Sequence, residues 1–149
     1  MLKTALVILL VAGLAGCAAI RAPAKYGSFV KAPVASDDKA IADDVVKKLA
    51  ALYPPAKTRF NLQHATPDAF GINMVSEMRT KGYAVAELKP GARPPALAAG
   101  EQSLAYVIDQ PLEAGLYRVT VLVNSQTLSR VYQSAGGAVV PAGAWVRKE

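Results

Sequence analysis

The strongest constraint on the fold lies at the amino terminus, where one basic residue precedes an unbroken apolar run. Lys3 is followed by Thr4 to Leu14, a stretch that contains no charged residue. The run is about a dozen residues long, whereas a membrane-spanning helix needs about 20. This length and the preceding positive charge are typical of a secretory signal peptide. We therefore expect residues 1–16 to be removed and the fold to be built from the rest.

The residues after the apolar run predict where cleavage occurs. Leu14-Ala15-Gly16-Cys17 resembles the lipobox of bacterial lipoproteins, in which Leu and two small residues precede a cysteine. Small side chains let the peptidase reach the bond between Gly16 and Cys17, and the cysteine thiol then accepts a diacylglycerol. The chain has one cysteine, so neither an internal disulfide nor a thiolate metal cluster is expected. The alternative is an ordinary secretory signal followed by a chance cysteine.

Acylation of Cys17 predicts a protein that is held on a membrane by lipid alone. Burial of acyl chains contributes about 0.8 kcal/mol per CH₂, so several palmitate-length chains give near-permanent anchoring. Ala18 follows the cysteine, whereas an aspartate at that position is the usual signal for retention in the inner membrane of enteric bacteria. We therefore expect a lipid-anchored protein at the periplasmic face of the outer membrane.

The composition of the chain fits a single folded domain. Of its 149 residues, 52% are hydrophobic and 19% are charged, which permits a packed core and argues against global disorder. The formal net charge of +6 suits an anionic partner, although ordinary solubility charge is the simpler interpretation. The basic residues are scattered without interleaved aromatics, so direct nucleic-acid binding is not expected.

Residues 17–35 are interpreted as the lipidated cysteine and a tether. The segment is rich in Ala, Pro and Lys and shows no period of 2 or 3.6 residues, which is typical of a linker. Tyr26 to Val30 is an apolar exception within it. We expect this part to pack either on the protein's own domain or on the sheet edge of a partner. Tyr26, Phe29 and Val30 are the candidate contact residues.

Two helices are predicted after the tether. Apolar residues at helical spacing predict the first over residues 37–52, with Ser36 as its N-cap and two aspartates in its first turn. Thr66-Pro67-Asp68 predicts the start of the second, with the threonine as N-cap, and Gly82 marks its end. Short strands are expected at residues 58–62 and 83–88. The Pro and Gly residues of the segment 89–100 predict an exposed loop.

The last third of the chain predicts an antiparallel meander. Strands are expected near residues 104–108, 116–123 and 126–133, with Asn124-Ser125 as a hairpin turn and residues 141–146 as a short edge strand. The order of elements predicts an α+β domain over residues 36–149, with two helices packed on one face of a mainly antiparallel sheet. The predicted core residues are Ile41, Val45, Leu49, Phe70, Met74, Leu116, Val119 and Val121.

No group of residues has the pattern of a catalytic or metal site. His64 is the one histidine, and with Asp68 alone it makes a poor metal site, so we interpret it as a surface or helix-capping residue. Asp43 and Asp44 diverge on a helix and cannot act as a glycosidase pair. The serines lack a nucleophile-elbow context. We therefore predict no enzymatic activity, no cofactor and no metal, and no small-molecule substrate is identified.

Several stretches of the domain resemble the TrbH family of conjugal-transfer lipoproteins. They are Tyr53-Pro54-Pro55-Ala56-Lys57-Thr58-Arg59, Asp68-Ala69-Phe70-Gly71, Gly82-Tyr83-Ala84-Val85, Tyr117-Arg118-Val119-Thr120-Val121, Leu128-Ser129-Arg130-Val131-Tyr132 and Pro141-Ala142-Gly143-Ala144-Trp145. The resemblance implies a structural and assembly subunit of a conjugative type IV secretion (mating-pair-formation) channel, with other channel subunits as partners. It carries over no active-site residue.

The competing hypothesis is a free periplasmic lipoprotein that binds cell wall or a small ligand. A concave pocket lined by aromatic side chains and convergent polar groups would favour this second class. Acylated Cys17 is a functional residue under both hypotheses.

Overall fold

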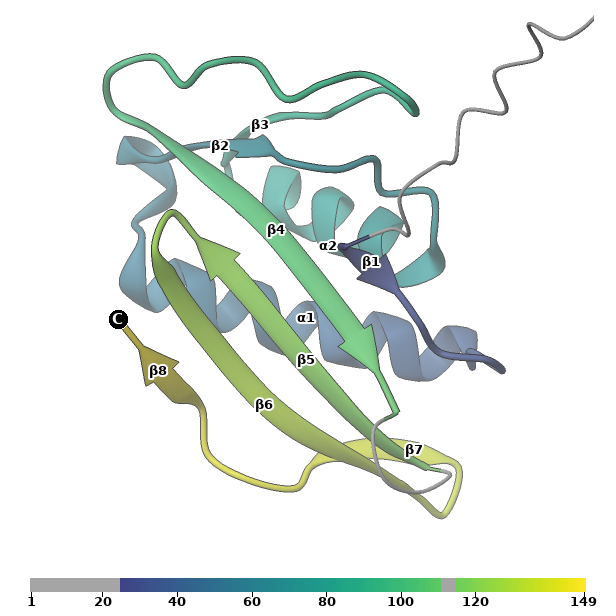
Figure 1. The fold of residues 1–149 in the computed structure, drawn as a ribbon. Coiled ribbons are helices and arrows are strands. Elements are labelled where there is room, and N and C mark those ends of the chain that lie inside the picture. Colours follow the sequence, from purple (N-terminus) through teal and green to yellow (C-terminus); the bar gives the residue numbers. More distant parts are fainter. Residues whose placement is uncertain (1–24, 111–114) are drawn as a thin grey trace, which may run out of the picture.

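The computed structural model describes residues 25–110 and 115–149 (Figure 1). The predicted signal peptide, its cleavage site at Gly16 and Cys17, and residues 17–24 of the predicted tether lie outside the described residues. No helix in the described part is long and apolar enough to span a membrane. The elements are β1 (Gly27–Ser28), α1 (Ala35–Leu52), the 3₁₀ helix η2 (Pro55–Lys57), β2 (Arg59–Leu62), α2 (Ala69–Thr80), β3 (Ala84–Ala86), β4 (Glu101–Asp109), β5 (Leu116–Val123), β6 (Gln126–Ala135), β7 (Ala138–Pro141) and β8 (Val146–Lys148).

In the described residues, eight strands form one sheet in the order β3-β2-β4-β5-β6-β7, with β1 added beside β4 and β8 beside β6. β4 to β8 pair antiparallel, whereas β1, β2 and β3 pair parallel to their neighbours. The parallel pair β2–β3 follows from its connection through α2, because a helical crossover returns the chain in the same direction. Both helices cover one face of the sheet (Figure 1). The predicted α+β class and its one-sided helices are confirmed.

The hydrophobic core lies between the two helices and the covered face of the sheet. Of the eight predicted core residues, seven have no exposed surface. Leu116 is the exception and is half-buried, so its prediction as a core residue is wrong. Alternate residues of β5 face the helices, starting from Tyr117, which leaves Leu116 on the opposite face.

The two helices start at other positions than the sequence predicts. α1 begins two residues early and takes Val34 as its N-cap, so Ser36 lies inside the first turn without a capping bond. α2 is capped by Asp68, whose Oδ1 accepts a hydrogen bond from the Gly71 N–H at 2.9 Å. Thr66 was the predicted cap, but a carboxylate also interacts favourably with the positive end of the helix dipole.

The carboxy-terminal segment returns along the edge of β6 and forms two strands instead of one. Gly136 and Gly137 both have positive φ, and they turn the chain into β7, which pairs with the last residues of β6. β8 pairs with the first residues of β6, and between them the Ala142 N–H donates to the Val131 oxygen at 2.9 Å. The predicted strand at residues 141–146 is therefore wrong in position. The chain's own end covers the backbone groups of this sheet edge.

Candidate functional site

The segment nearest the predicted anchor is built into the sheet. Gly27 and Ser28 form β1 and pair parallel with β4, and the Phe29 N–H donates to the Ile108 oxygen at 2.8 Å. Of the two alternatives for Tyr26 to Val30, the structure therefore shows packing on the protein's own domain.

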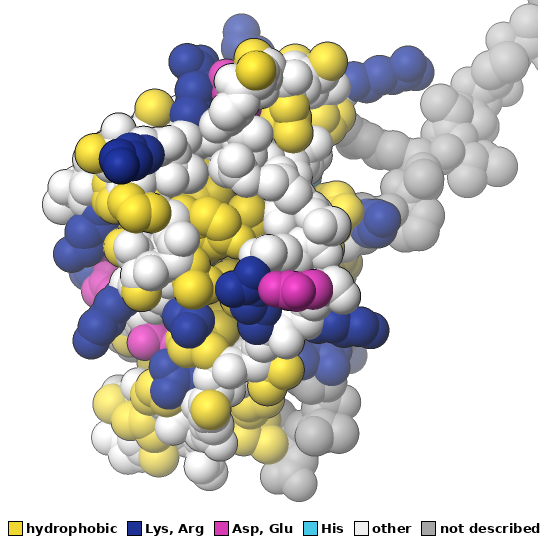
Figure 2. Space-filling view, turned by 90° about the vertical axis from the view of Figure 1, so that its left-hand side faces the viewer, with side chains coloured by type: hydrophobic (Ala, Val, Ile, Leu, Met, Phe, Trp, Pro, Cys, Tyr) yellow, Lys and Arg dark blue, Asp and Glu magenta, His cyan; other side chains and the backbone are white. Residues whose placement is uncertain are grey.

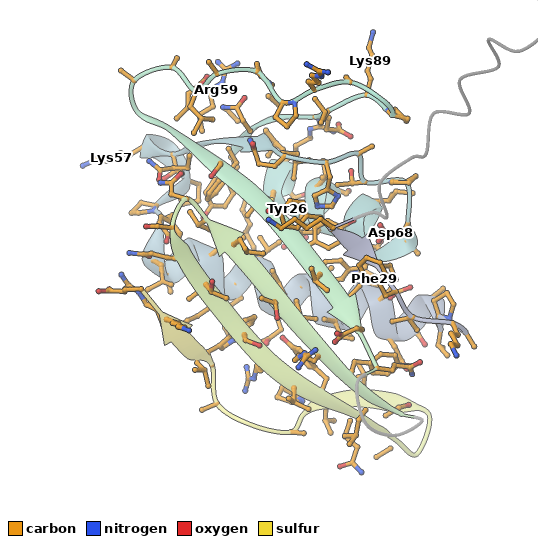
Figure 3. All side chains as sticks on the ribbon, in the orientation of Figure 1. Tyr26, Phe29, Lys57, Arg59, Asp68 and Lys89 are labelled. Atoms are coloured by element: carbon orange, nitrogen blue, oxygen red, sulfur yellow. The ribbon has the colours of Figure 1, made fainter. Side chains whose placement is uncertain are left out.

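The three candidate contact residues of this segment differ in exposure. Tyr26 is half-buried, and its ring centroid lies 5.6 Å from that of His64. Val30 packs against the core, whereas the Phe29 side chain is 46% exposed. Figure 3 shows Tyr26 and Phe29 at the place where β1 meets β4. Contact of the exposed Phe29 with a partner stays a prediction.

The His64 side chain, instead of a strand backbone, accepts a hydrogen bond along one edge of β4. β2 covers the first half of this edge and β1 covers the second half. Between them, the Tyr106 N–H donates to His64 Nε2 at 3.3 Å, while His64 Nδ1 lies 2.9 Å from the Ala65 oxygen. These partners require the neutral ring with its proton on Nδ1.

Burial lowers the pKa of His64 below its usual value, in agreement with a neutral ring. The interpretation as a surface or helix-capping histidine is wrong, because the side chain accepts a hydrogen bond from the backbone of β4 and is half-buried. No local sequence pattern predicts this role, since the gap between β1 and β2 arises only when distant segments of the chain pair.

Three carboxyl groups meet where the amino termini of α1 and α2 converge beside β1. Asp68 Oδ2 accepts the Tyr106 hydroxyl at 2.6 Å, and Asp37 Oδ2 accepts the Tyr117 hydroxyl at 3.2 Å. Asp38 is 4% exposed, and its burial, together with repulsion from the other two carboxylates, raises its pKa to about 6. Within the described residues, no three His, Cys, Asp or Glu side chains are placed to hold a metal ion. The cluster therefore connects β4 and β5 to the two helix starts.

A second polar cluster lies at the far edge of the sheet, between α1 and the loop from β7 to β8. Arg130 of β6 donates through Nη1 to Asp44 Oδ2 at 2.9 Å and through Nε to the Gly143 oxygen at 2.7 Å. Tyr132 donates its hydroxyl to the same Asp44 oxygen at 2.7 Å. The Arg130 guanidinium also lies 5.8 Å from the centroid of the Trp145 ring. These contacts hold the loop and α1 together.

Beside this cluster is a groove of about 260 Å³, whose walls carry two lysines of α1. Figure 2 shows this side of the molecule, where Lys and Arg side chains surround a hydrophobic area. The groove is lined by Asp44, Lys47, Lys48, Ala51, Arg130 and Trp145.

Another hollow, of about 500 Å³, lies between η2 and the loop before β4. Its lining consists of residues 55–59, Gly82, Ala84 and residues 98–101, none of which is aromatic. An ion pair of 2.9 Å joins Arg59 to Glu101 within it. The hollow therefore lacks the aromatic lining that a small-ligand site of the competing class would have.

Comparison with known proteins gives one informative result. No curated protein and no solved structure matches the chain. A protein-family model described as "Conjugal transfer protein TrbH" matches residues 23–149, a range that contains both clusters and every element from β1 to β8. The chain therefore belongs to the TrbH family of conjugal transfer proteins.

Proposed function

We propose that this protein is a lipid-anchored periplasmic subunit of a conjugative type IV secretion channel, with a structural and assembly role at the outer membrane. The observation that carries the proposal is the family match over residues 23–149. The sequence Leu14-Ala15-Gly16-Cys17 ends five residues before that match and supports the anchor.

The position of β1 supports a domain that stays close to its membrane. From Cys17 to Gly27 the chain has ten residue steps (27 − 17), which span at most about 36 Å at up to 3.6 Å each. Since Gly27 is paired with β4, the strand order of the sheet fixes where the tether joins the domain. Gly27, and with it the β1 side of the domain, would therefore stay within this distance of the bilayer.

The polar clusters of the domain support a structural rather than a catalytic role. His64, Asp68 and Arg130 each donate or accept hydrogen bonds that join separate elements. Side chains engaged in this way position strands and helices relative to one another. The proposed contribution of the domain is thus to present surfaces to other subunits of the channel.

Mating assays test the proposal directly. A donor strain that lacks this protein should lose DNA transfer, and the wild-type chain supplied in trans should restore it. The Cys17→Ser variant should fail to incorporate labelled palmitate, should keep its uncleaved signal peptide and should not restore transfer. Immunoblots must show that the variant accumulates to a comparable level. Normal transfer from the deletion strain would overturn the channel role, and equal labelling of Cys17→Ser would overturn the anchor.

A further inference from the structure

The groove beside Trp145 carries positive charge that the domain does not neutralise. We call the surface formed by Lys47, Lys48, Ala51 and Trp145 the basic groove. The one carboxylate that lines the same pocket, Asp44, is already bound to Arg130 and to the Tyr132 hydroxyl. Among the described residues, seven ion pairs form, and neither Lys47 nor Lys48 belongs to any of them. The two ammonium groups are therefore available to an anionic ligand.

The apolar wall of the groove is fixed in place before any ligand arrives. Trp145 packs partly against the core, and the Arg130 guanidinium lies over its ring at 5.8 Å. Arg130 is in turn held by Asp44 and by the Gly143 oxygen. Ala51 of α1 adds a small apolar surface to the same pocket. A tryptophan held in place in this way is typical of protein–protein contacts, since little conformational freedom is lost on binding.

The position of the groove favours a protein ligand over the lipid surface that anchors the chain. β1, the described element nearest Cys17, lies outside β4, whereas β8 lies outside β6. The three strands β4, β5 and β6 therefore separate the entry of the tether from the edge that carries Trp145 (Figure 1). A domain tethered through β1 can present this edge away from the bilayer.

We propose that the basic groove binds an acidic segment of another protein, with carboxylates on Lys47 and Lys48 and an apolar side chain against Trp145. The proposal deepens the proposed function, because it names the chemistry of the partner that such a subunit would hold. Binding is driven by charge complementarity at the rim and by burial of apolar surface at the centre.

The chain offers its own probe for this proposal, since Trp145 is its one tryptophan. The full acylated protein in non-ionic detergent is titrated with a tryptophan-free peptide of alternating acidic and leucine residues, and Trp145 emission is followed. We expect saturable blue-shifted emission that weakens with added salt. A peptide with Asn and Gln in place of Asp and Glu should produce no change. No response to the acidic peptide would overturn the proposal.

Charge-reversal variants separate groove binding from general attraction to a basic protein. Lys47→Glu/Lys48→Glu should weaken peptide binding by about tenfold or more, equivalent to about 1.4 kcal/mol. The control, Lys89→Glu/Arg93→Glu, changes the net charge equally on the exposed loop before β4 and should leave affinity within about twofold. Figure 3 shows Lys89 on this loop. Thermal unfolding must show that both variants fold. Equal weakening by the two variants would overturn the proposal.

Two further measurements distinguish the other outcomes. In a parallel titration, vesicles that contain phosphatidylglycerol replace the peptide. A blue shift of Trp145 emission with vesicles but not with the peptide would overturn the proposal that the groove binds a protein segment. Mating by the groove variant separates this proposal from the function on which it rests. Lost peptide binding with normal mating would overturn a role of the groove in transfer and leave the channel role intact. Normal mating in the deletion strain would overturn the channel role, whereas the peptide titration would still test whether the groove binds an acidic segment.

Discussion

Asp38 illustrates at the scale of one residue how the fold tolerates an unfavourable charge. Its side chain is 4% exposed, and none of the ion pairs among the described residues includes it. Burial and the neighbouring Asp68 and Asp37 carboxylates raise its pKa from 3.8 to about 6. The folded protein therefore binds a proton more tightly than the unfolded chain does. Stability from this group is present below pH 4 and is lost as the pH rises to about 6.

We predict that Asp38→Asn stabilises the domain at neutral pH. A rise in pKa from 3.8 to about 6 corresponds to at most about 3 kcal/mol, and the positive end of the α1 dipole offsets part of that cost. We expect the free energy of unfolding at pH 7.5 to increase by about 1 kcal/mol, and the gain to vanish at pH 4. Denaturant unfolding at both pH values measures this. Asp43→Asn, on the exposed side of α1, is the control, and an equal gain at both pH values would contradict the prediction.

His64 shows the opposite dependence on pH. Because its pKa is lowered in the folded state, the unfolded chain binds more protons near pH 6, and the stability that the neutral ring contributes is lost as the pH falls below about 6.5. We predict that His64→Leu destabilises the domain by about 1–3 kcal/mol at pH 7.5, since the Tyr106 N–H loses its acceptor. The variant should also lose this pH dependence. His64→Gln, which keeps an acceptor, should recover part of the stability, and equal losses in both variants would argue against the hydrogen bond.

At the scale of elements, the sequence patterns predict those parts of the fold that depend on local chemistry. The apolar stripe through Ile41, Val45 and Leu49 specifies α1, and Asn124-Ser125 specifies the hairpin between β5 and β6. Gly82, with φ of 92°, ends α2 as predicted. Each of these signals is contained within a few neighbouring residues.

The parts that were missed depend on pairing between distant segments. β1 consists of two residues, and only its register with Val107 and Ile108 makes it a strand. β7 was missed because the residues 138–141 carry no alternation of their own and pair instead with the end of β6. The candidate groove was missed for the same reason, since Lys47 and Trp145 are brought together only by tertiary structure.

We predict that β1 contributes to stability although it is short. A chain that begins at Lys31 keeps the Val34 N-cap of α1 and all core residues and should still fold, but it lacks the cover that β1 and Val30 give to β4 and the core. We expect its free energy of unfolding to be about 1–3 kcal/mol lower than that of a chain that begins at Lys25. Urea unfolding of both chains measures the difference.

The control for this truncation is Phe29→Ser in the longer chain. Phe29 is 46% exposed, so its replacement should lower the free energy of unfolding by less than the truncation does. If the chain that begins at Lys25 and the shorter chain without β1 had equal free energies of unfolding, β1 would contribute nothing to stability.

At the scale of the whole molecule, the proposed anchor at Cys17 and the one-sided domain would together restrict where partners contact the protein. A tether from Cys17, as proposed, would join the domain at β1 beside β4, and the basic groove lies three strands away at the edge of β6. If lipid attachment and domain contacts act together, the tether sets the effective concentration of the domain near the membrane. That concentration falls as the tether becomes longer than the distance it must span.

We therefore predict that lengthening the tether reduces transfer without impairing acylation or folding. Insertion of ten or twenty Gly-Ser residues between Ala24 and Lys25 leaves Cys17, β1 and the domain unchanged in sequence. Mating frequency should fall stepwise, by several-fold for the longer insert, because effective concentration decreases roughly as the −3/2 power of length. Palmitate labelling and the thermal unfolding midpoint should match those of the wild type. The same twenty residues inserted after Gly91, in the exposed loop before β4, serve as the control and should leave transfer near normal. Undiminished mating with the longest tether would show that the domain needs no fixed distance from its anchor.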